Sequence, residues 1–177
     1  MVESLILKSI EEVEKLLKIK LDKSISSVVK KYPLYISKYY LNLIDKKDPY
    51  NDPIFKQCVP SVLEIKTNNT DDEDPQQEKK YEVVPKLIRR YKDRALILTT
   101  HRCPTFCRFC FRKRYWNNYH SSRDITIEEI NKIVSYIKQH KEIKEVILSG
   151  GDFLILPLSK IKNILDILSL IDSVDII

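Results

Sequence analysis

Three cysteines stand close together in the stretch HRCPTFCRFCFRKRYW, with the spacing C-x3-C-x2-C. They are Cys103, Cys107 and Cys110. Four cysteine thiolates normally hold an Fe–S cluster, so three would hold three irons of a [4Fe–4S] cluster and leave the fourth iron open to a small molecule. The alternative is a zinc site completed by His101 or His120. We favour the cluster, because zinc ligand sets more often combine one C-x2-C with a second close pair.

The composition is that of a globular chain of 177 residues, with 43% hydrophobic and 32% charged residues. The net charge of +6 is modest, and basic residues are concentrated only in Arg108–Arg114. The first residues carry no secretory signal, and no apolar run is long enough to span a membrane. We therefore expect a cytoplasmic protein with reduced thiols and no membrane or nucleic-acid partner. Cys58 lies far from the triplet and is expected to be a structural thiol.

The first half of the chain predicts helices. Apolar residues recur at helical spacing over 3–20, a second amphipathic segment covers Ser26–Lys31, and Ser37 can cap a helix over KYYLNLI. Repeated Pro and Asp residues predict irregular chain from Asp48 to Pro60. We thus expect a helical region over residues 1–66, followed by an acidic linker over residues 67–80.

The second half alternates between strand and helix patterns. Buried strands are predicted at Ala95–Thr99 and Glu145–Leu148, with a capping box at Thr126 and Glu129 between them. A helix from Ser159 and an apolar run at Val174–Ile177 follow. This order is typical of a parallel α/β sheet with right-handed crossovers, in which functional loops follow the strands. The fold class is therefore α/β, with an incomplete barrel domain over residues 81–177.

The chain has only two glycines, and they are adjacent. Gly150 and Gly151 follow the second predicted strand, in the sequence SGGD. Glycine allows a close approach of the backbone that a Cβ would prevent. We expect such an approach here, and the alternative is a simple tight turn.

The chain resembles the lysine 2,3-aminomutase family of radical S-adenosylmethionine (SAM) enzymes. The resemblance begins near Tyr32 and runs to the last residue. The segments that carry it are YYLNLIDKKDPYNDPIFKQCVPS at Tyr39–Ser61, DEDP from Asp72, LIRRYKDRALILTTHRCPTFCRFCFRKR across 87–114 and VILSGGDFLIL at 146–156. The order and spacing of these segments make chance agreement improbable.

The resemblance implies a role for each matching residue. Cys103, Cys107 and Cys110 would ligate the [4Fe–4S] cluster, and Phe109 would pack near the adenine of SAM. The backbone and carboxylate of Ser149, Gly150, Gly151 and Asp152 would receive the amino group of SAM. Tyr91 and Arg94 would contact pyridoxal 5′-phosphate (PLP), and Arg112 would pair with the substrate carboxylate. The alternative for Arg108, Arg112, Lys113 and Arg114 is a solvated basic face.

The activity implied is an isomerisation, in which an amino group moves from C2 to C3 of an amino acid held on PLP. The radical that begins the reaction comes from SAM, with electrons from a flavodoxin or ferredoxin. The residues around the third cysteine, with Phe109 and Phe111, are more similar to relatives that act on a protein-bound lysine, such as that of elongation factor P. The substrate is therefore lysine, a related amino acid or a lysine in a protein.

The family continues through further βα units, including the lysine that would hold PLP. We therefore expect this chain to be a fragment whose C-terminal half is supplied in trans, and Ala95–Thr99 and Val174–Ile177 to be open sheet edges. Two alternatives are a radical SAM enzyme without PLP chemistry and a zinc-stabilised nucleic-acid-binding module. The latter depends on the aromatic and basic residues of RFCFRKRYW.

Overall fold

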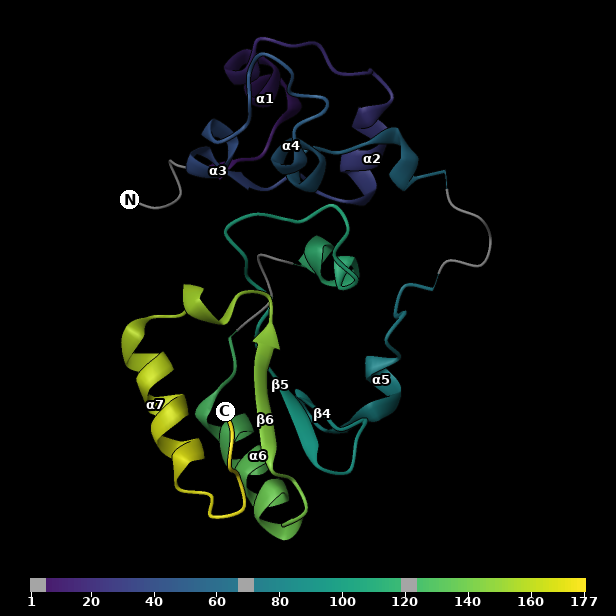
Figure 1. The fold of residues 1–177 in the computed structure, drawn as a ribbon. Helices are drawn as coiled ribbons and strands as arrows, with labels where there is room; N and C mark the ends of the chain where they lie inside the picture. The colour runs from purple at the N-terminus through teal and green to yellow at the C-terminus, as the bar shows by residue number, and fades with distance from the viewer. Residues whose placement is uncertain (1–5, 67–71, 119–123) are drawn as a thin grey trace. The chain divides into compact units, whose positions relative to one another are not determined.

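The computed structural model describes residues 6–66, 72–118 and 124–177. It divides the chain into two compact units, shown in Figure 1. Unit 1 comprises residues 1–73 and 104–117, and unit 2 comprises residues 74–103 and 118–177. Each unit has its own hydrophobic core. Unit 1 therefore contains residues 104–117, which we expected within the 81–177 domain.

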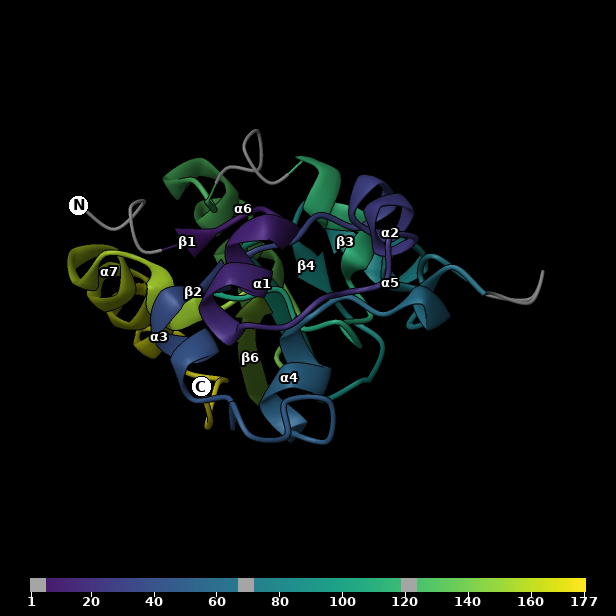
Figure 2. The same cartoon turned by 90° about the horizontal axis from the view of Figure 1, so that it is seen from above.

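Unit 1 is mainly helical, as the sequence predicts. Its helices are α1 (Ile10–Leu17), α2 (Ile25–Lys31), α3 (Lys38–Asn42) and α4 (Pro53–Cys58), with short 3-10 helices at Val62–Glu64 and Lys113–Asn118. Two short antiparallel strands, β1 (Ile6–Leu7) and β2 (Ile36–Ser37), pair beside α3 (Figure 2). The core gathers buried apolar side chains from these elements, including Val13, Leu17, Ile36, Leu41 and Phe55.

Side-chain caps explain where the first helices begin. Ser9 and Glu12 form a capping box, so α1 begins at Ile10, and Ile6 and Leu7 form a strand instead of the expected helix. Residues 3–5 of the expected helix lie outside the described residues. The helix ends at Lys18, whose φ of 57° is left-handed. The predicted cap at Ser37 is confirmed, because its hydroxyl accepts the N–H of Tyr40.

The prediction of irregular chain from Asp48 to Pro60 is wrong, because α4 lies within it. The Asp52 carboxylate accepts the N–H groups of Ile54 and Phe55 at 2.7 and 2.9 Å. Pro53 occupies the first turn, where the missing N–H of proline is tolerated and its fixed φ suits a helix. The Asp-Pro pair, interpreted as a break, is therefore a helix start.

Unit 2 contains a mixed four-stranded sheet in the order β3-β4-β5-β6. The strands are β3 (Glu82–Val84), β4 (Leu87–Ile88), β5 (Arg94–Thr100) and β6 (Glu145–Gly150). The helices are α5 (Glu78–Tyr81), α6 (Ile127–Gln139) and α7 (Leu158–Ser169), with a 3-10 turn at Phe153–Ile155. Helices α6 and α7 pack on one face of the sheet, and their apolar side chains share one core with β4, β5 and β6 (Figure 2).

The parallel pairing of β5 with β6 and the capping box of Thr126 with Glu129 are confirmed. The expected open edge at Ala95–Thr99 is wrong, because β4 pairs antiparallel with β5 through Leu87 and Ile97. The hairpin of β3 and β4 was not predicted. Its turn places Lys86 at a φ of 67°, a conformation that lysine rarely adopts. Because this position holds a lysine and not a glycine, the sequence gives no sign of a turn here.

The ends of the predicted linker and strand also differ from the expectation. Helix α5 occupies the last part of the expected linker, and residues 67–71 lie outside the described residues. The apolar run at Val174–Ile177 makes one parallel bridge, between Ile176 and Glu145 on β6. The sheet is thus consistent with part of a barrel, and barrel closure stays a prediction. No helix in the described ranges is long and apolar enough to cross a membrane.

Candidate functional site

The cysteine loop divides between the two units. Cys103 belongs to unit 2, and Cys107 and Cys110 belong to unit 1. All three are half-buried cysteines that form no disulfide. Over residues 6–66, 72–118 and 124–177, no group of three histidine, cysteine or carboxylate side chains is arranged to hold a metal. The convergence of the three thiols, expected from their spacing, stays a prediction.

In unit 1, backbone hydrogen bonds attach the cysteine loop to the helical region. The N–H of Phe106 donates to the carbonyl of Tyr35 at 2.7 Å, and the N–H of Arg108 donates to the carbonyl of Gln57 at 2.7 Å. The Phe106 ring stacks on Trp116 with 4.5 Å between centroids and on Tyr35 with 5.0 Å. These contacts hold the residues on both sides of Cys107.

An ion network around the buried Arg108 strengthens the same attachment. Arg108 donates to both carboxylate oxygens of Glu64 at 3.0 Å and to the carbonyl of Pro33 at 3.0 Å. Lys113 donates to Glu64 at 2.6 Å. Burial acts to raise the pKa of Glu64, but the hydrogen bonds from Arg108 and Lys113 outweigh it, so the pKa is lowered. The alternative of a solvated basic face is therefore wrong for Arg108, which is buried and paired.

The sulfur atoms of unit 1 receive hydrogen bonds. The Nε2 of Gln57 donates to Sγ of Cys107 at 3.3 Å, and the N–H of Arg112 donates to Sγ of Cys110 at 3.4 Å. Burial raises the pKa of Cys110 above its usual value. Hydrogen bonds to cysteine sulfur are among the features that tune Fe–S clusters. These half-buried thiols with N–H donors at sulfur therefore fit a cluster.

Cys58 has a different environment. Its side chain is fully buried in the core of unit 1, and burial raises its pKa to about 12. The structure agrees with the expectation of a structural thiol.

The other predicted site residues of unit 1 differ in exposure. Arg112 is buried, with its guanidinium 4.6 Å from the ring centroid of Phe111, so it too is not part of a solvated face. Phe109 is 73% exposed and lines a groove of about 580 Å³ with Leu63, Tyr50 and other residues of this unit. The predicted contacts of Arg112 with substrate and of Phe109 with adenine stay predictions.

In unit 2, Gly150 and Gly151 allow the close approach that the sequence predicts. A Cβ at Gly150 would lie 2.1 Å from the carbonyl oxygen of Thr100, and one at Gly151 would lie 2.1 Å from that of Arg102. The N–H of Gly151 donates to Thr100 at 2.6 Å, and the N–H of Asp152 donates to Arg102 at 2.8 Å. The two glycines therefore bring the SGGD loop against the backbone of Thr100 and Arg102, in the segment that leads into Cys103.

Asp152 has a local structural role as well. Its Oδ1 accepts the N–H of Leu154 at 3.0 Å and caps the 3-10 turn at Phe153–Ile155. The carbonyl of Ser149 accepts the hydroxyl of Thr99 at 2.9 Å. The SGGD segment is thus fixed by backbone and capping bonds at the carboxyl end of β6, the end where ligands bind in α/β sheets.

A charged network that the sequence did not reveal lies next to Cys103. Arg102 donates to both oxygens of Asp124 at 3.0 and 2.8 Å, and the Thr100 hydroxyl donates to Asp124 at 2.8 Å. Burial opposes ionisation of Asp124, but these bonds prevail and lower its pKa. The partners are 22 residues apart in sequence, so no local pattern predicts them.

The predicted PLP residues lie at the opposite end of β5 from the cysteine loop. The Arg94 guanidinium lies 5.6 Å from the ring centroid of Tyr91 and pairs with Asp93 and Glu145 at 3.5 and 3.6 Å. At roughly 3.3 Å per residue, the seven residues of β5 span about 20 Å. Tyr91 and Arg94 therefore do not gather with SGGD, and a shared site would have to extend along the strand. Their role stays a prediction.

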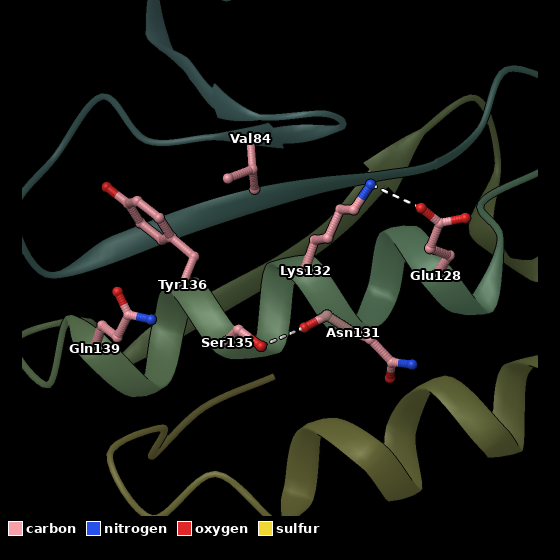
Figure 3. A pocket seen from close by; sticks show the side chains of 7 residues that line it. All are labelled: Val84, Glu128, Asn131, Lys132, Ser135, Tyr136 and Gln139. Carbon is pink, nitrogen blue, oxygen red and sulfur yellow. Dashed lines mark hydrogen bonds and ion pairs between the residues drawn. The ribbon is translucent and has the colours of Figure 1, made fainter.

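The structure has a polar groove of about 430 Å³ in unit 2 that is separate from these residues. Figure 3 shows it along α6, with Val84 of β3 on the other side. Lys132 pairs with Glu128 across one end at 2.8 Å, and the Ser135 hydroxyl donates to the carbonyl of Asn131. None of the predicted site residues lines this groove. His120, one of the two candidate zinc ligands, lies outside the described residues, and His101 belongs to unit 2.

The cysteine and SGGD segments lie in a part of the chain that matches a known protein family. The family described as the radical SAM superfamily matches residues 97–174, which include Cys103, Cys107, Cys110 and SGGD. Residues 97–174 therefore form a radical SAM domain. The radical SAM family implies a [4Fe–4S] cluster and SAM.

Within that superfamily, the chain is a relative of the L-lysine 2,3-aminomutases. It is 38% identical over 173 residues to a putative L-lysine 2,3-aminomutase of Aquifex aeolicus, a match that covers 97% of this chain and 46% of the relative. The L-lysine 2,3-aminomutase of Clostridium subterminale is 37% identical over 156 residues, with 88% of this chain and 37% of the relative covered. That of Methanococcus maripaludis is 36% identical over 175 residues, with 97% and 40% covered. The chain spans less than half the length of these relatives.

Proposed function

We propose that this chain is part of a radical SAM amino-acid 2,3-aminomutase that acts on lysine or a related amino group. One observation carries the proposal. The C-x3-C-x2-C triplet lies inside the superfamily match, its thiols are half-buried and not in disulfides, and the sulfur atoms of Cys107 and Cys110 accept hydrogen bonds. A lysine of a protein such as elongation factor P is part of the proposed substrate class, because Phe109 and Phe111 flank the third cysteine.

The residues present fit the proposed cofactors to different degrees. Cys103, Cys107 and Cys110 would hold the cluster, and the SGGD loop would meet the amino group of SAM. When bound, the cluster, SAM and PLP supply the radical chemistry, while the protein orients them and excludes water. Arg112 would orient the substrate, because a guanidinium grips a carboxylate through two parallel hydrogen bonds.

The proposed PLP site depends on residues that this chain supplies only in part. Tyr91 offers an aromatic face and Arg94 a cation, but Arg94 is already paired with two carboxylates. We propose that further residues, in a C-terminal portion supplied in trans, complete the PLP site and the barrel. A flavodoxin or ferredoxin is the proposed electron donor.

The cluster is tested by anaerobic reconstitution of the whole chain with iron and sulfide. We expect a brown protein with broad absorbance near 400 nm, the region where iron–sulfur charge transfer absorbs. Replacing Cys103, Cys107 or Cys110 by alanine should remove the colour. Cys58→Ala is the matched control and should retain it, because Cys58 is buried in the core.

A second measurement separates the radical SAM reaction from other cluster proteins. With the cluster reduced, SAM should be cleaved to methionine and 5′-deoxyadenosine. Asp152→Asn keeps the size of the side chain but removes the negative charge, and it should weaken SAM binding. A colourless protein with stoichiometric zinc would refute the cluster. An affinity for SAM that is the same in Asp152→Asn as in the parent protein would refute the role of Asp152.

A further inference from the structure

Gln57 makes two contacts with consecutive parts of the cysteine loop. Its backbone carbonyl accepts the N–H of Arg108 at 2.7 Å, and its side-chain Nε2 donates to Sγ of Cys107 at 3.3 Å. It occupies the last turn of α4, which Asp52 caps at the other end. One residue of unit 1 therefore contacts both the sulfur of a proposed cluster ligand and the backbone of the residue that follows it.

The orientation of the Gln57 amide is fixed by a third residue. The Tyr40 hydroxyl donates to Oε1 of Gln57. An amide that accepts through its oxygen from Tyr40 must present its NH2 group toward Cys107, and the reverse orientation would place two acceptors, oxygen and sulfur, together.

The chemistry of the sulfur explains what the bond would do. A cysteine thiolate that ligates iron is an acceptor, and its electron density increases when the cluster gains an electron. An N–H donor at that sulfur stabilises the reduced cluster more than the oxidised one, and hydrogen bonding to sulfur is one of the determinants of cluster potential.

We propose that Gln57, oriented by Tyr40, is a positioning residue that holds Cys107 for the cluster and raises the reduction potential of that cluster. This inference rests on the proposed function, because it requires Cys107 to be an iron ligand. The backbone contact of Gln57 with Arg108 survives any change of its side chain. A substitution of the side chain therefore isolates the N–H···S bond.

The test is a redox titration of the reconstituted whole chain, followed by electron paramagnetic resonance of the reduced cluster. Gln57→Leu has a similar volume without the donor. We expect it to lower the ratio of reduced to oxidised cluster at a fixed potential by about tenfold, which is about 59 mV for a one-electron couple. Tyr40→Phe, which only removes the group that orients the amide, should change the potential in the same direction by less.

Gln139→Leu is the matched control, because Gln139 is an exposed glutamine on α6 in unit 2. It should leave the potential and the resonance of the parent protein unchanged. A Gln57→Leu protein that holds its cluster at the parent potential would overturn the inference, while the proposed function would stand. If Gln57→Leu does not fold, a Tyr40→Phe protein with the parent potential overturns the inference in the same way. A parent chain that binds no cluster would overturn both, and the missing colour identifies that case.

Discussion

The two units fix their parts of the cysteine loop by opposite means. Unit 1 uses side chains: a buried arginine paired with a glutamate, an aromatic stack, and a glutamine that donates to a cysteine sulfur. Unit 2 removes side chains, since two glycines let the SGGD loop bond directly to the carbonyls of Thr100 and Arg102. The comparison shows that a loop can be held by charges that must be paired or by a backbone approach that tolerates no Cβ. Substitutions should separate the two.

The largest expected effect is in unit 1. Arg108→Ala leaves the Glu64 carboxylate, whose side chain is only 9% exposed, with only Lys113 beside it, and breaking a buried pair from one side destabilises by about 4 kcal/mol. Urea unfolding followed by the fluorescence of Trp116, the only tryptophan, measures the loss. The double variant Arg108→Met, Glu64→Leu should recover much of the stability, because it removes both the carboxylate and the guanidinium, and the Lys113 ammonium that loses its partner is 20% exposed to solvent. A double variant as unstable as Arg108→Ala would show that packing, and not charge, dominates.

The next effect is in unit 2. Gly151→Ala introduces a Cβ 2.1 Å from the carbonyl oxygen of Arg102, and the backbone shift that relieves it costs about 3 kcal/mol. Gly150→Ala should be at least as severe, because the φ of Gly150 is 118°. Hydrogen exchange of the β5 and β6 amides measures the change in unit 2. Ser135→Ala, on the exposed face of α6, is the control, and protection unchanged by Gly151→Ala would contradict the close approach.

The two units can also be compared by how their stability depends on pH, because each contains a carboxylate with a lowered pKa. The folded pKa values of Glu64 and Asp124 lie below their unfolded values, so each contributes stability above the unfolded pKa that is lost as pH falls through the folded pKa. Stability should therefore decrease below about pH 4 with a slope of at most about 1.4 kcal/mol per pH unit for each group.

Two substitutions assign this acid dependence. Glu64→Gln should flatten the pH dependence of unit 1, measured by tryptophan fluorescence. Asp124→Asn should reduce that of unit 2, measured by hydrogen exchange, and Glu142, whose pKa the hydrogen bond from Arg89 lowers to about 2, contributes to the dependence that remains. A parent-like slope in either variant would show that other carboxylates govern the acid response of that unit.

The smallest expected effect concerns a helix cap in each unit. Ser9→Ala in α1 and Thr126→Ala in α6 remove the hydroxyls that accept the N–H groups of Glu12 and Glu129, at a loss of about 1 kcal/mol each. Thermal unfolding measures both. Equal losses would show that caps are interchangeable between the units, in contrast to the loop contacts.

Local patterns predicted the elements of this fold better than its long-range contacts. The caps at Ser37 and Thr126 and the β5–β6 pair follow from side-chain chemistry within a few residues. The hairpin before β5 was missed because Lys86 adopts the left-handed conformation without glycine. Helix α4 was missed because Asp52 and Pro53, which often break helices, begin one here.

In the candidate site too, local motifs could be predicted from the sequence and long-range contacts could not. The triplet and SGGD were recognised from spacing and residue type, which are visible in one short stretch. The network of Arg102 with Asp124 and the pair of Arg108 with Glu64 join residues 22 and 44 positions apart. Their charges carry no local sign of a partner, so the basic run could equally be interpreted as a solvated surface. The burial of Arg108 in the structure excludes the solvated surface for that residue.

The discontinuity of unit 1 has a consequence for how the protein is made. Residues 1–73 leave the ribosome first, but Phe106, Arg108 and Trp116, which complete the unit, follow only after the first strands of unit 2. Until then Glu64 has neither of its cations, and Tyr35 lacks its stacking partner. Domains usually fold in order of synthesis, but here the first part of the chain must wait for a later segment. A nascent chain stalled between residues 73 and 104 should therefore be sensitive to protease in its helical region, and synthesis past residue 117 should protect it.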